Sequence, residues 1–276
     1  MQKSNLNSRF TAPKEWQPEL FSEPGLFSAF AAVFPLAEQT DFPSPQLLTA
    51  WLHLHTRLQD WSFVDSTVLD DDGRYYEDFI AQSQQIPMRA NNWHDLFGAL
   101  IWCLFPKTKN LLNQLHMAEI GLHGVKTRSK LRNKLTLFDE CGVILCVESA
   151  AWQQVDLLRT HQWRQSFVVQ RADWWQQLRP VIFGHAIYEM ATAPFIGLTA
   201  KTLFIKVPDG FCQWSLTAAY SFLDRELHEQ IANGAVLLDN QQLTPLPVLG
   251  VPGWYDDNNN PGFYNNTDYF RPLRQR

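Results

Sequence analysis

The chain has 276 residues, of which 45% are hydrophobic and 18% are charged; this mix is typical of a soluble globular protein and excludes a disordered or fibrous one. The net charge of −5 argues against a wholly basic nucleic-acid binder. No CxxC pair occurs among the four cysteines, so we expect neither a disulfide framework nor a cysteine zinc site. The longest apolar run, 96–105, is half of the about 20 residues that a membrane span needs. No signal peptide is visible at the start, so we expect a cytoplasmic protein with no membrane partner.

The first half of the chain divides into an arm and the start of one domain. Residues 1–25 are polar and contain three prolines, which predicts an N-terminal arm, and 26–276 are expected to form a single globular domain with a wrapping C-terminal tail. Leu47, Trp51, Leu54 and Leu58 recur at helical spacing, as is typical of a helix over 46–60. A strand is predicted over 63–69, followed by a hairpin turn at 70–73, because Asp-Gly favours such turns.

The middle of the chain contains its most apolar segment. Asn91 and Asn92 can cap a helix over 93–104, and Pro106 suits the first position of a second helix that would run to about residue 120 and stop at Gly121. We expect these two helices to form a buried central helical hairpin. A β-hairpin is predicted next, with strands 134–138 and 143–147; the second strand is apolar throughout, which indicates a central position in a sheet.

The C-terminal half is expected to alternate helices with one strand before an irregular tail. The tail is rich in Pro, Asn, Asp and aromatic residues and is expected to wrap around the body. The other expected elements are helices over 149–160, from Asp173, over 180–193 and over 214–232, and a strand over 198–207. The whole pattern predicts an α+β fold that is predominantly α, with small β-hairpins.

Charge is distributed unevenly along the chain. Residues 89–134 contain eight Lys or Arg and two acidic residues, which gives this segment +6 and leaves −11 for the rest. Such asymmetry can produce a local positive field on an acidic protein. The segment therefore suggests an anionic small molecule as a partner, and it leaves nucleic acid open as another.

The same segment contains the candidate catalytic residues. His94 and Asp95 open the apolar helix, where free backbone N–H groups favour an anion. His116 lies on a helix face with two other polar residues, and Asp139 stands at the predicted hairpin turn with Glu140. We expect His94 and His116 to act as acid or base, with Asp95 or Asp139 orienting one of them. An ordinary capping histidine and a solvated turn explain these positions equally well.

The candidate anion-binding residues lie between the two histidines and just beyond them. Lys109, Asn113 and His116 follow i, i+4, i+7 spacing, which places them within about 60° on one helix face. Arg side chains can hold phosphate or carboxylate in bidentate fashion. We therefore expect the anion to be bound by basic and amide side chains, namely Lys107, Lys109, Asn113, Arg128 and Arg132. A solvated basic surface is the alternative.

A metal ion could also be bound. His185 and Glu189 are four residues apart on an expected helix, so they share a face and could be two ligands, or a histidine held by a carboxylate. His94 and His116 could join them, although no spacing fixes the set. The cofactor stays unknown at this stage, with a divalent metal ion as the candidate.

Several segments together resemble the bacterial domain of unknown function family 3025, over about residues 45–272. The segments that carry the resemblance read NNWHDLFGALIW, FPKTKNLLNQLH, LTLFDECG, FGHAIYE and VPGWYDDNNNPGFYNNTDYFRP. The resemblance implies one domain over most of the chain and a bacterial origin, and it implies no reaction or cofactor. Lys107 stands where the resemblance leads us to expect Arg, which keeps the charge and loses the bidentate geometry.

The candidate residues favour an enzyme that acts on an anionic, phosphate-bearing small molecule or nucleotide by acid–base or metal-assisted chemistry. The alternatives are a non-catalytic protein that binds an anion or a partner, and an assembly protein that uses the aromatic tail. Convergence of His94, His116, Asp139 and His185 on one concave pocket would favour the enzyme. Exposed tail aromatics in a large patch would favour assembly.

Overall fold

The computed structural model describes residues 10–237 and 243–273, and it has an α+β fold that is predominantly α. The described helices are α1 (Ser28–Ala31), α2 (Pro45–His55), α3 (Ser66–Asp72), α4 (Tyr76–Ser83), α5 (Trp93–Leu104), α6 (Pro106–His123), α7 (Lys130–Cys141), α8 (Gln153–Arg159), α9 (His185–Ala191) and α10 (Leu216–Ala232). The described strands are β1 (Ser62–Asp65), β2 (Gln85–Met88), β3 (Gly142–Val147), β4 (Leu178–Ile182), β5 (Thr199–Lys206) and β6 (Thr244–Pro247).

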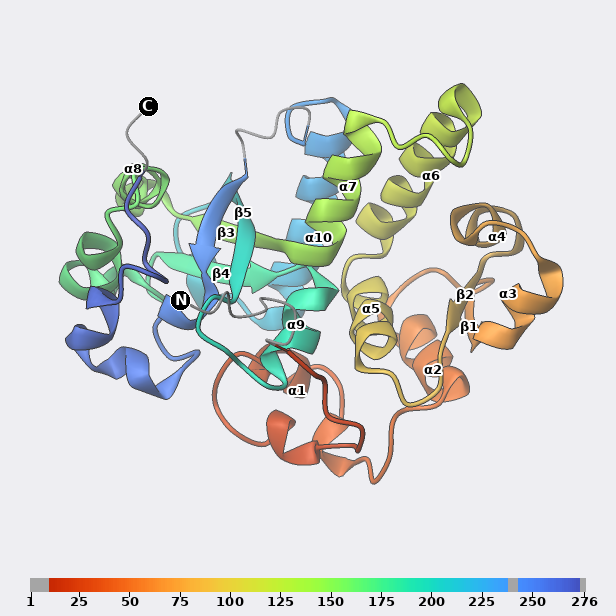
Figure 1. Ribbon diagram of the computed structural model, residues 1–276, viewed down its shortest axis with the longest axis horizontal. Helices are drawn as coiled ribbons and strands as arrows, with labels where there is room; N and C mark the ends of the chain where they lie inside the picture. The colour runs from red at the N-terminus through yellow and green to blue at the C-terminus, as the bar shows by residue number, and fades with distance from the viewer. Residues whose placement is uncertain (1–9, 238–242, 274–276) are drawn as a thin grey trace, which may run out of the picture.

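Two small sheets organise these elements. The larger has the strand order β4-β3-β5-β6, in which β3 runs parallel to β5 and antiparallel to β4. The smaller is the parallel pair β1-β2. Figure 1 shows the larger sheet on one side of the molecule and the small β1-β2 pair with α2, α3 and α4 on the other, with α5, α6 and α7 between them.

The apolar helix predicted over 93–104 is confirmed as α5, and it lies in the core. Asn92 caps it by accepting a hydrogen bond from the backbone N–H of Asp95 at 3.0 Å. Phe97, Leu100 and Ile101 are fully buried. After the single residue Phe105 the chain enters α6, of which only one face is buried. No helix within the described residues is long and apolar enough to cross a membrane.

The β-hairpin predicted over 134–147 is wrong in its first half. Residues 130–141 form α7, which Ser129 caps, so the predicted turn at Asp139 and Glu140 is the last turn of a helix. Leu131, Leu135 and Phe138 recur at helical spacing, and Leu135 and Phe138 are fully buried. The second half of the prediction is confirmed, because β3 is buried throughout and lies between β4 and β5.

The predicted strand over 63–69 and its hairpin turn are also wrong. The strand β1 ends at Asp65, whose side chain caps the short helix α3. Gly73 ends that helix in the left-handed region, with φ 76°, instead of closing a hairpin. The partner of β1 is β2, which runs parallel to it after α4.

Three further boundaries differ from the sequence prediction. Pro180 lies in β4, opposite Leu145 of β3, and α9 begins only at His185. The helix α6 continues past Gly121 to His123, and Gly124 with φ 77° follows its end. Asp173 ends a short 3-10 turn and does not cap a helix. The predicted strand over 198–207 and helix over 214–232 are confirmed as β5 and α10.

Both ends of the described chain pack against the body. Of the predicted arm, residues 1–9 lie outside the described residues, while Trp16 stacks on Trp93 with ring centroids 5.0 Å apart. In the tail, Tyr264, Tyr269 and Phe270 are buried. The side chain of Asn258 donates hydrogen bonds to the carbonyls of residues 249 and 251, so it links two segments of the tail. Residues 274–276 lie outside the described part.

We expect Tyr269→Phe to lower the free energy of unfolding by about 1–3 kcal/mol, since it leaves buried backbone groups without a partner. The Tyr269 hydroxyl accepts from the N–H of Leu249 at 2.9 Å and donates to the carbonyl of Leu198 at 2.6 Å. Denaturant unfolding measures the change. Tyr76→Phe is the control, because the Tyr76 hydroxyl has no hydrogen bond to any described residue. Equal stability of the two variants would contradict the anchoring role.

Candidate functional site

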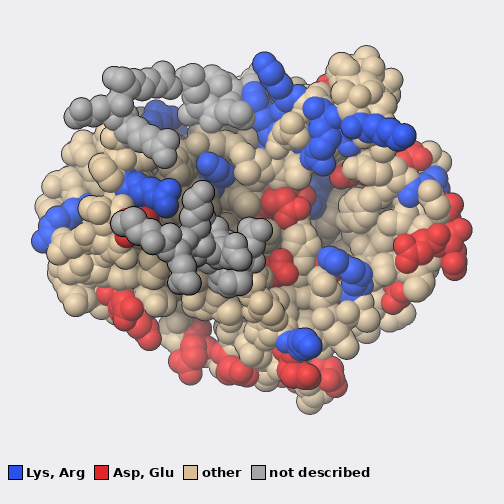
Figure 2. All heavy atoms as spheres, in the orientation of Figure 1, with Lys and Arg blue, Asp and Glu red and all other residues tan. Residues whose placement is uncertain are grey.

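A cavity of about 440 Å³ opens between the β1-β2 side of the molecule and the helices α5, α6, α7 and α9. Its lining includes apolar side chains, among them Phe63, Ile80 and Trp102, together with histidines and carboxylates. Figure 2 shows acidic side chains at the hollowed centre of this face, with Lys and Arg side chains gathered above them. The cavity therefore combines an apolar surface with a concentrated group of titratable side chains.

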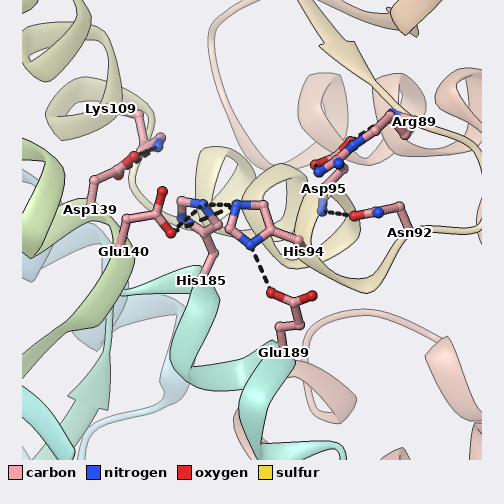
Figure 3. Close-up of polar contacts among 9 residues, drawn as sticks. All are labelled: Arg89, Asn92, His94, Asp95, Lys109, Asp139, Glu140, His185 and Glu189. Carbon is pink, nitrogen blue, oxygen red and sulfur yellow. Dashed lines mark hydrogen bonds and ion pairs between the residues drawn. The ribbon is translucent and has the colours of Figure 1, made fainter. Parts of the chain in front are cut away.

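Two histidines and one carboxylate meet at one point of the cavity wall. The Nε2 atoms of His94 and His185 lie 3.0 Å apart. Glu140 Oε2 lies 3.7 Å from His94 Nε2 and 3.5 Å from His185 Nε2. Figure 3 shows that the three side chains come from different helices and point toward one another. His94 is in the first turn of α5, Glu140 is in the last turn of α7, and His185 begins α9.

A close backbone contact places His185 beside Glu140. The N–H groups of Phe183 and Gly184 both donate to the carbonyl of Gly142, at 3.0 and 2.8 Å. A Cβ atom at Gly184 would lie only 2.5 Å from the carbonyl oxygen of Glu140 and 2.4 Å from the nitrogen of Gly142. Only glycine fits this contact, which joins the start of α9 to the end of α7.

Glu189 holds His94 from the other side of its ring. One turn after His185 on α9, its Oε2 lies 2.9 Å from His94 Nδ1. An ionised carboxylate only accepts hydrogen bonds, so Nδ1 carries the proton, and Nε2 of the neutral imidazole offers a lone pair beside Nε2 of His185. The hydrogen bond to Glu189 raises the pKa of His94 above its ordinary value. Burial lowers the pKa of His185 to about 4 and raises the pKa of Glu140.

Lys109 and Asp139 form a buried ion pair next to Glu140. The Lys109 ammonium lies 2.6 and 2.8 Å from the two oxygens of Asp139, and it also lies 5.6 Å from the centre of the Trp102 ring. Burial, the largest single influence, would raise the pKa of Asp139, but the charge and hydrogen bond of Lys109 together with the two nearby histidines hold the pKa below the ordinary value. The predicted anion-binding lysine is thus already neutralised by the predicted catalytic carboxylate.

His116 and Asn113 lie in the wall formed by α6. Burial lowers the pKa of His116 to about 4, so its imidazole is neutral near pH 7. It makes no hydrogen bond within the described residues, and its Nδ1 is buried. The Asn113 amide donates to the backbone carbonyl and the carboxylate of Glu77, at 2.9 and 2.7 Å. Asn113 therefore fastens α4 to α6 through its amide group.

The other predicted basic residues divide between cavity and scaffold. Arg128 lines the cavity, where Asn133 and Thr136 orient its guanidinium. Arg132 is 1% exposed and donates to the carbonyls of residues 125 and 127, so it fastens the loop before α7. Lys107 is not among the lining residues. Its backbone N–H donates to Asp224 Oδ2, a carboxylate that occupies the N-terminus of α6.

Asp95 lines the cavity but contacts neither histidine ring by a hydrogen bond. Its carboxylate accepts from the backbone N–H of Arg89 at 2.7 Å and from the Arg89 guanidinium at 2.9 and 2.8 Å. This pair closes the connection between β2 and α5, as Figure 3 shows. The structure therefore brings His94, His116, Asp139 and His185 to one cavity and assigns the orientation of His94 to Glu189.

The sequence indicates Glu140 only as a further carboxylate at a hairpin turn and gives no role to Glu77, and it leaves Glu189 as either a metal ligand or a carboxylate that holds His185. Glu140 was obscured because residues 134–147 were interpreted as a hairpin. The helical recurrence of Leu131, Leu135 and Phe138 was the signal that places Glu140 at the end of a helix. No sequence signal joins Glu77 to Asn113, which are 36 residues apart.

Comparison with known proteins agrees with the resemblance carried by the sequence segments. A family model described as "Protein of unknown function (DUF3025)" matches residues 61–274. No curated protein and no solved structure matches the chain. The family match spans β1 to the buried tail and includes every residue of the cavity cluster. The chain therefore belongs to the DUF3025 family.

Proposed function

We propose that this protein is an enzyme that acts on a small anionic molecule, in the first instance a phosphate-bearing one, within the cavity. The observation that carries the proposal is the convergence of His94, His116, His185, Asp139 and Glu140 on one concave site from four separate helices. Titratable groups that converge in a pocket are the usual mark of a catalytic site. A structural role alone gives no reason to collect three imidazoles around one cavity.

The chemistry that these groups support is proton transfer, with or without a bound metal ion. Without a bound metal ion, His94 suits an acid, because its hydrogen bond to Glu189 raises its pKa. His116 is neutral near pH 7, since burial lowers its pKa to about 4, and it lines the cavity, so it suits a hydrogen-bonding group or a base toward a molecule there.

Arg128 supports the anionic character of the substrate. Three basic side chains of the Lys or Arg type line the cavity, and two of them already hold a carboxylate: Arg89 binds Asp95 and Lys109 binds Asp139. Arg128 has no carboxylate partner among the described residues. A guanidinium whose orientation is fixed by neutral groups is suited to bind a phosphate or carboxylate of a ligand.

The two alternatives have less support. A non-catalytic protein that binds through a flat basic face would leave the histidines scattered, whereas His94, His116 and His185 share one cavity. Assembly through the aromatic tail would need exposed rings, whereas Tyr264, Tyr269 and Phe270 are buried.

We expect Arg128→Ala to weaken binding of an anionic ligand by about 10- to 100-fold, since a hydrogen bond to a charged group contributes about 1.5–3 kcal/mol. A thermal-shift screen of nucleotides, sugar phosphates and carboxylates on the wild type identifies the ligand, and titration calorimetry then compares the variants. Binding should weaken as salt rises, because the charge of Arg128 is solvent-exposed.

The matched control is Arg57→Ala, which removes an exposed arginine outside the cavity and should leave binding unchanged. Arg128→Lys keeps the charge and loses the fork geometry, so it should fall between wild type and Arg128→Ala. If no anion stabilises the wild type, or if Arg128→Ala binds the ligand as tightly as Arg57→Ala does, this assignment of the substrate is wrong.

A further inference from the structure

Three atoms that can bind a metal ion, Nε2 of His94, Nε2 of His185 and Oε2 of Glu140, surround one point. Their mutual distances are 3.0, 3.5 and 3.7 Å, so they form a nearly equilateral triangle. Zinc–nitrogen bonds of about 2.0–2.1 Å in a tetrahedral site place neighbouring ligands about 3.3–3.4 Å apart. The triangle therefore has the size that one ion bound to all three atoms requires.

A hydrogen-bonded cluster explains the same atoms less completely. Glu189 fixes the Nδ1 proton of His94, so the lone pair of its neutral Nε2 points to the centre of the triangle. Glu140 Oε2 brings a second lone pair to that centre, and its nearest cationic or imidazole groups are the two histidines at 3.7 and 3.5 Å. Both distances exceed those of good hydrogen bonds. A proton shared between the two imidazole rings would therefore leave the carboxylate of Glu140 without a good hydrogen-bond donor.

On the side of His94 the surroundings of the triangle match those of a metal centre, whereas Nδ1 of His185 has no hydrogen-bond partner among the described residues. The carboxylate of Glu189 behind His94 is the kind of outer contact that orients metal-binding histidines. The tight contact of Gly184 with the backbone of residues 140–142 fixes two of the three ligands relative to each other. All three ligand residues line the cavity, so a fourth position faces the space where a substrate or water would bind.

We propose that His94, His185 and Glu140 bind one divalent transition-metal ion, with zinc as the first candidate, and that the open coordination position faces the cavity. Two imidazoles and one carboxylate are ligands that zinc and neighbouring first-row metals accept. Glu189 is a positioning residue in this site and not a ligand, which replaces the expected pair of His185 and Glu189. The proposal deepens the proposed function, but ion binding itself needs no substrate.

The test measures metal binding directly on the full chain. The protein is treated with a chelator, dialysed, and titrated with Zn²⁺ by calorimetry and with Co²⁺ by visible absorption, which reports the coordination of the ion. We expect one equivalent of either ion to bind. His185→Ala and Glu140→Gln should each weaken binding at least 100-fold, and Glu140→Gln keeps the shape of the side chain if the alanine variant fails to fold.

Two other variants separate a metal site from general damage to the cavity. Glu189→Gln should weaken Zn²⁺ binding by about 10- to 100-fold, as is typical of an outer contact of a metal ligand. His116→Ala removes an imidazole from the same cavity outside the triangle and should bind Zn²⁺ as the wild type does. Circular dichroism checks that each variant is folded.

The proposal is overturned if the wild type binds no stoichiometric ion, if Glu140→Gln binds Zn²⁺ as the wild type does, or if His116→Ala loses as much affinity as Glu140→Gln. The result is independent of the anion test, because Arg128→Ala should keep full Zn²⁺ affinity. If Arg128→Ala loses anion binding but the wild type binds no metal ion, the metal site is wrong. The proposed function then stands as that of a metal-free acid–base enzyme. If the protein binds a metal ion but no anion, the metal site stands and the proposed anionic substrate is wrong.

Discussion

Leu100→Ala is expected to lower the free energy of unfolding by about 2–5 kcal/mol, the range measured for removal of buried leucine side chains. Leu100 lies in the middle of α5, is fully buried, and has the fully buried Phe97 and Ile101 on the same helix. The substitution removes apolar contacts and leaves a cavity in a close-packed interior. Because the first turn of α5 also positions His94, the variant tests the scaffold of the candidate site as well.

The matched control is Leu122→Ala, a leucine near the end of α6 with 75% of its surface exposed. This substitution should change stability by less than about 0.5 kcal/mol, as is usual for exposed positions. Urea unfolding followed by tryptophan fluorescence gives both values. A loss below about 1 kcal/mol for Leu100→Ala would mean that α5 is not the centre of the core.

Lys109→Met is expected to cost about 3 kcal/mol, the lower end of the range for breaking a buried ion pair, because Asp139 then stays in the cavity wall without its cation. The Lys109 side chain is 9% exposed and that of Asp139 is 24% exposed, so solvent replaces the lost ammonium only in part. The double variant Lys109→Met with Asp139→Asn should recover much of the loss, since no charge is then left without a partner. A double-mutant cycle from urea unfolding measures the interaction between the two residues.

The cost of Lys109→Met should depend on pH in a defined direction. Lys109 holds the pKa of Asp139 below its ordinary value, so the pair contributes fully above the unfolded-state pKa of about 4. The contribution is lost as pH falls through the lowered pKa of the folded state. The difference in stability between wild type and Lys109→Met should therefore persist at pH 7 and shrink below about pH 4. An undiminished difference at low pH would show that the loss comes from packing against Trp102.

Sequence patterns were sufficient where local propensity and burial agree. The apolar run capped by Asn92 specified α5, and the apolar segments of β3 and β5 specified strands, since their side chains are buried in the larger sheet. The prediction failed at α7, where the turn-like Asp139 and Glu140 outweighed the helical spacing of Leu131, Leu135 and Phe138. Pro180 is typical of the start of a helix, but it lies in a strand that pairs with β3. Its partner there is Leu145, which is 35 residues away in sequence.

The sequence by itself determined a set of candidate residues: local patterns indicate His94, His116, His185 and Asp139, and all four line one cavity. Tertiary structure alone decided their partners. His185 and Glu189 share a helix face because they are four residues apart, yet both contact one ring, His94, which is 91 and 95 residues away.

The excess of basic residues over 89–134 is likewise not a positive pocket, because Lys109 pairs with Asp139 and Arg132 binds backbone carbonyls. Sequence spacing fixes which side chains share a face of a helix. Which groups neutralise, orient or complete them depends on packing between distant segments, and no local rule specifies that packing.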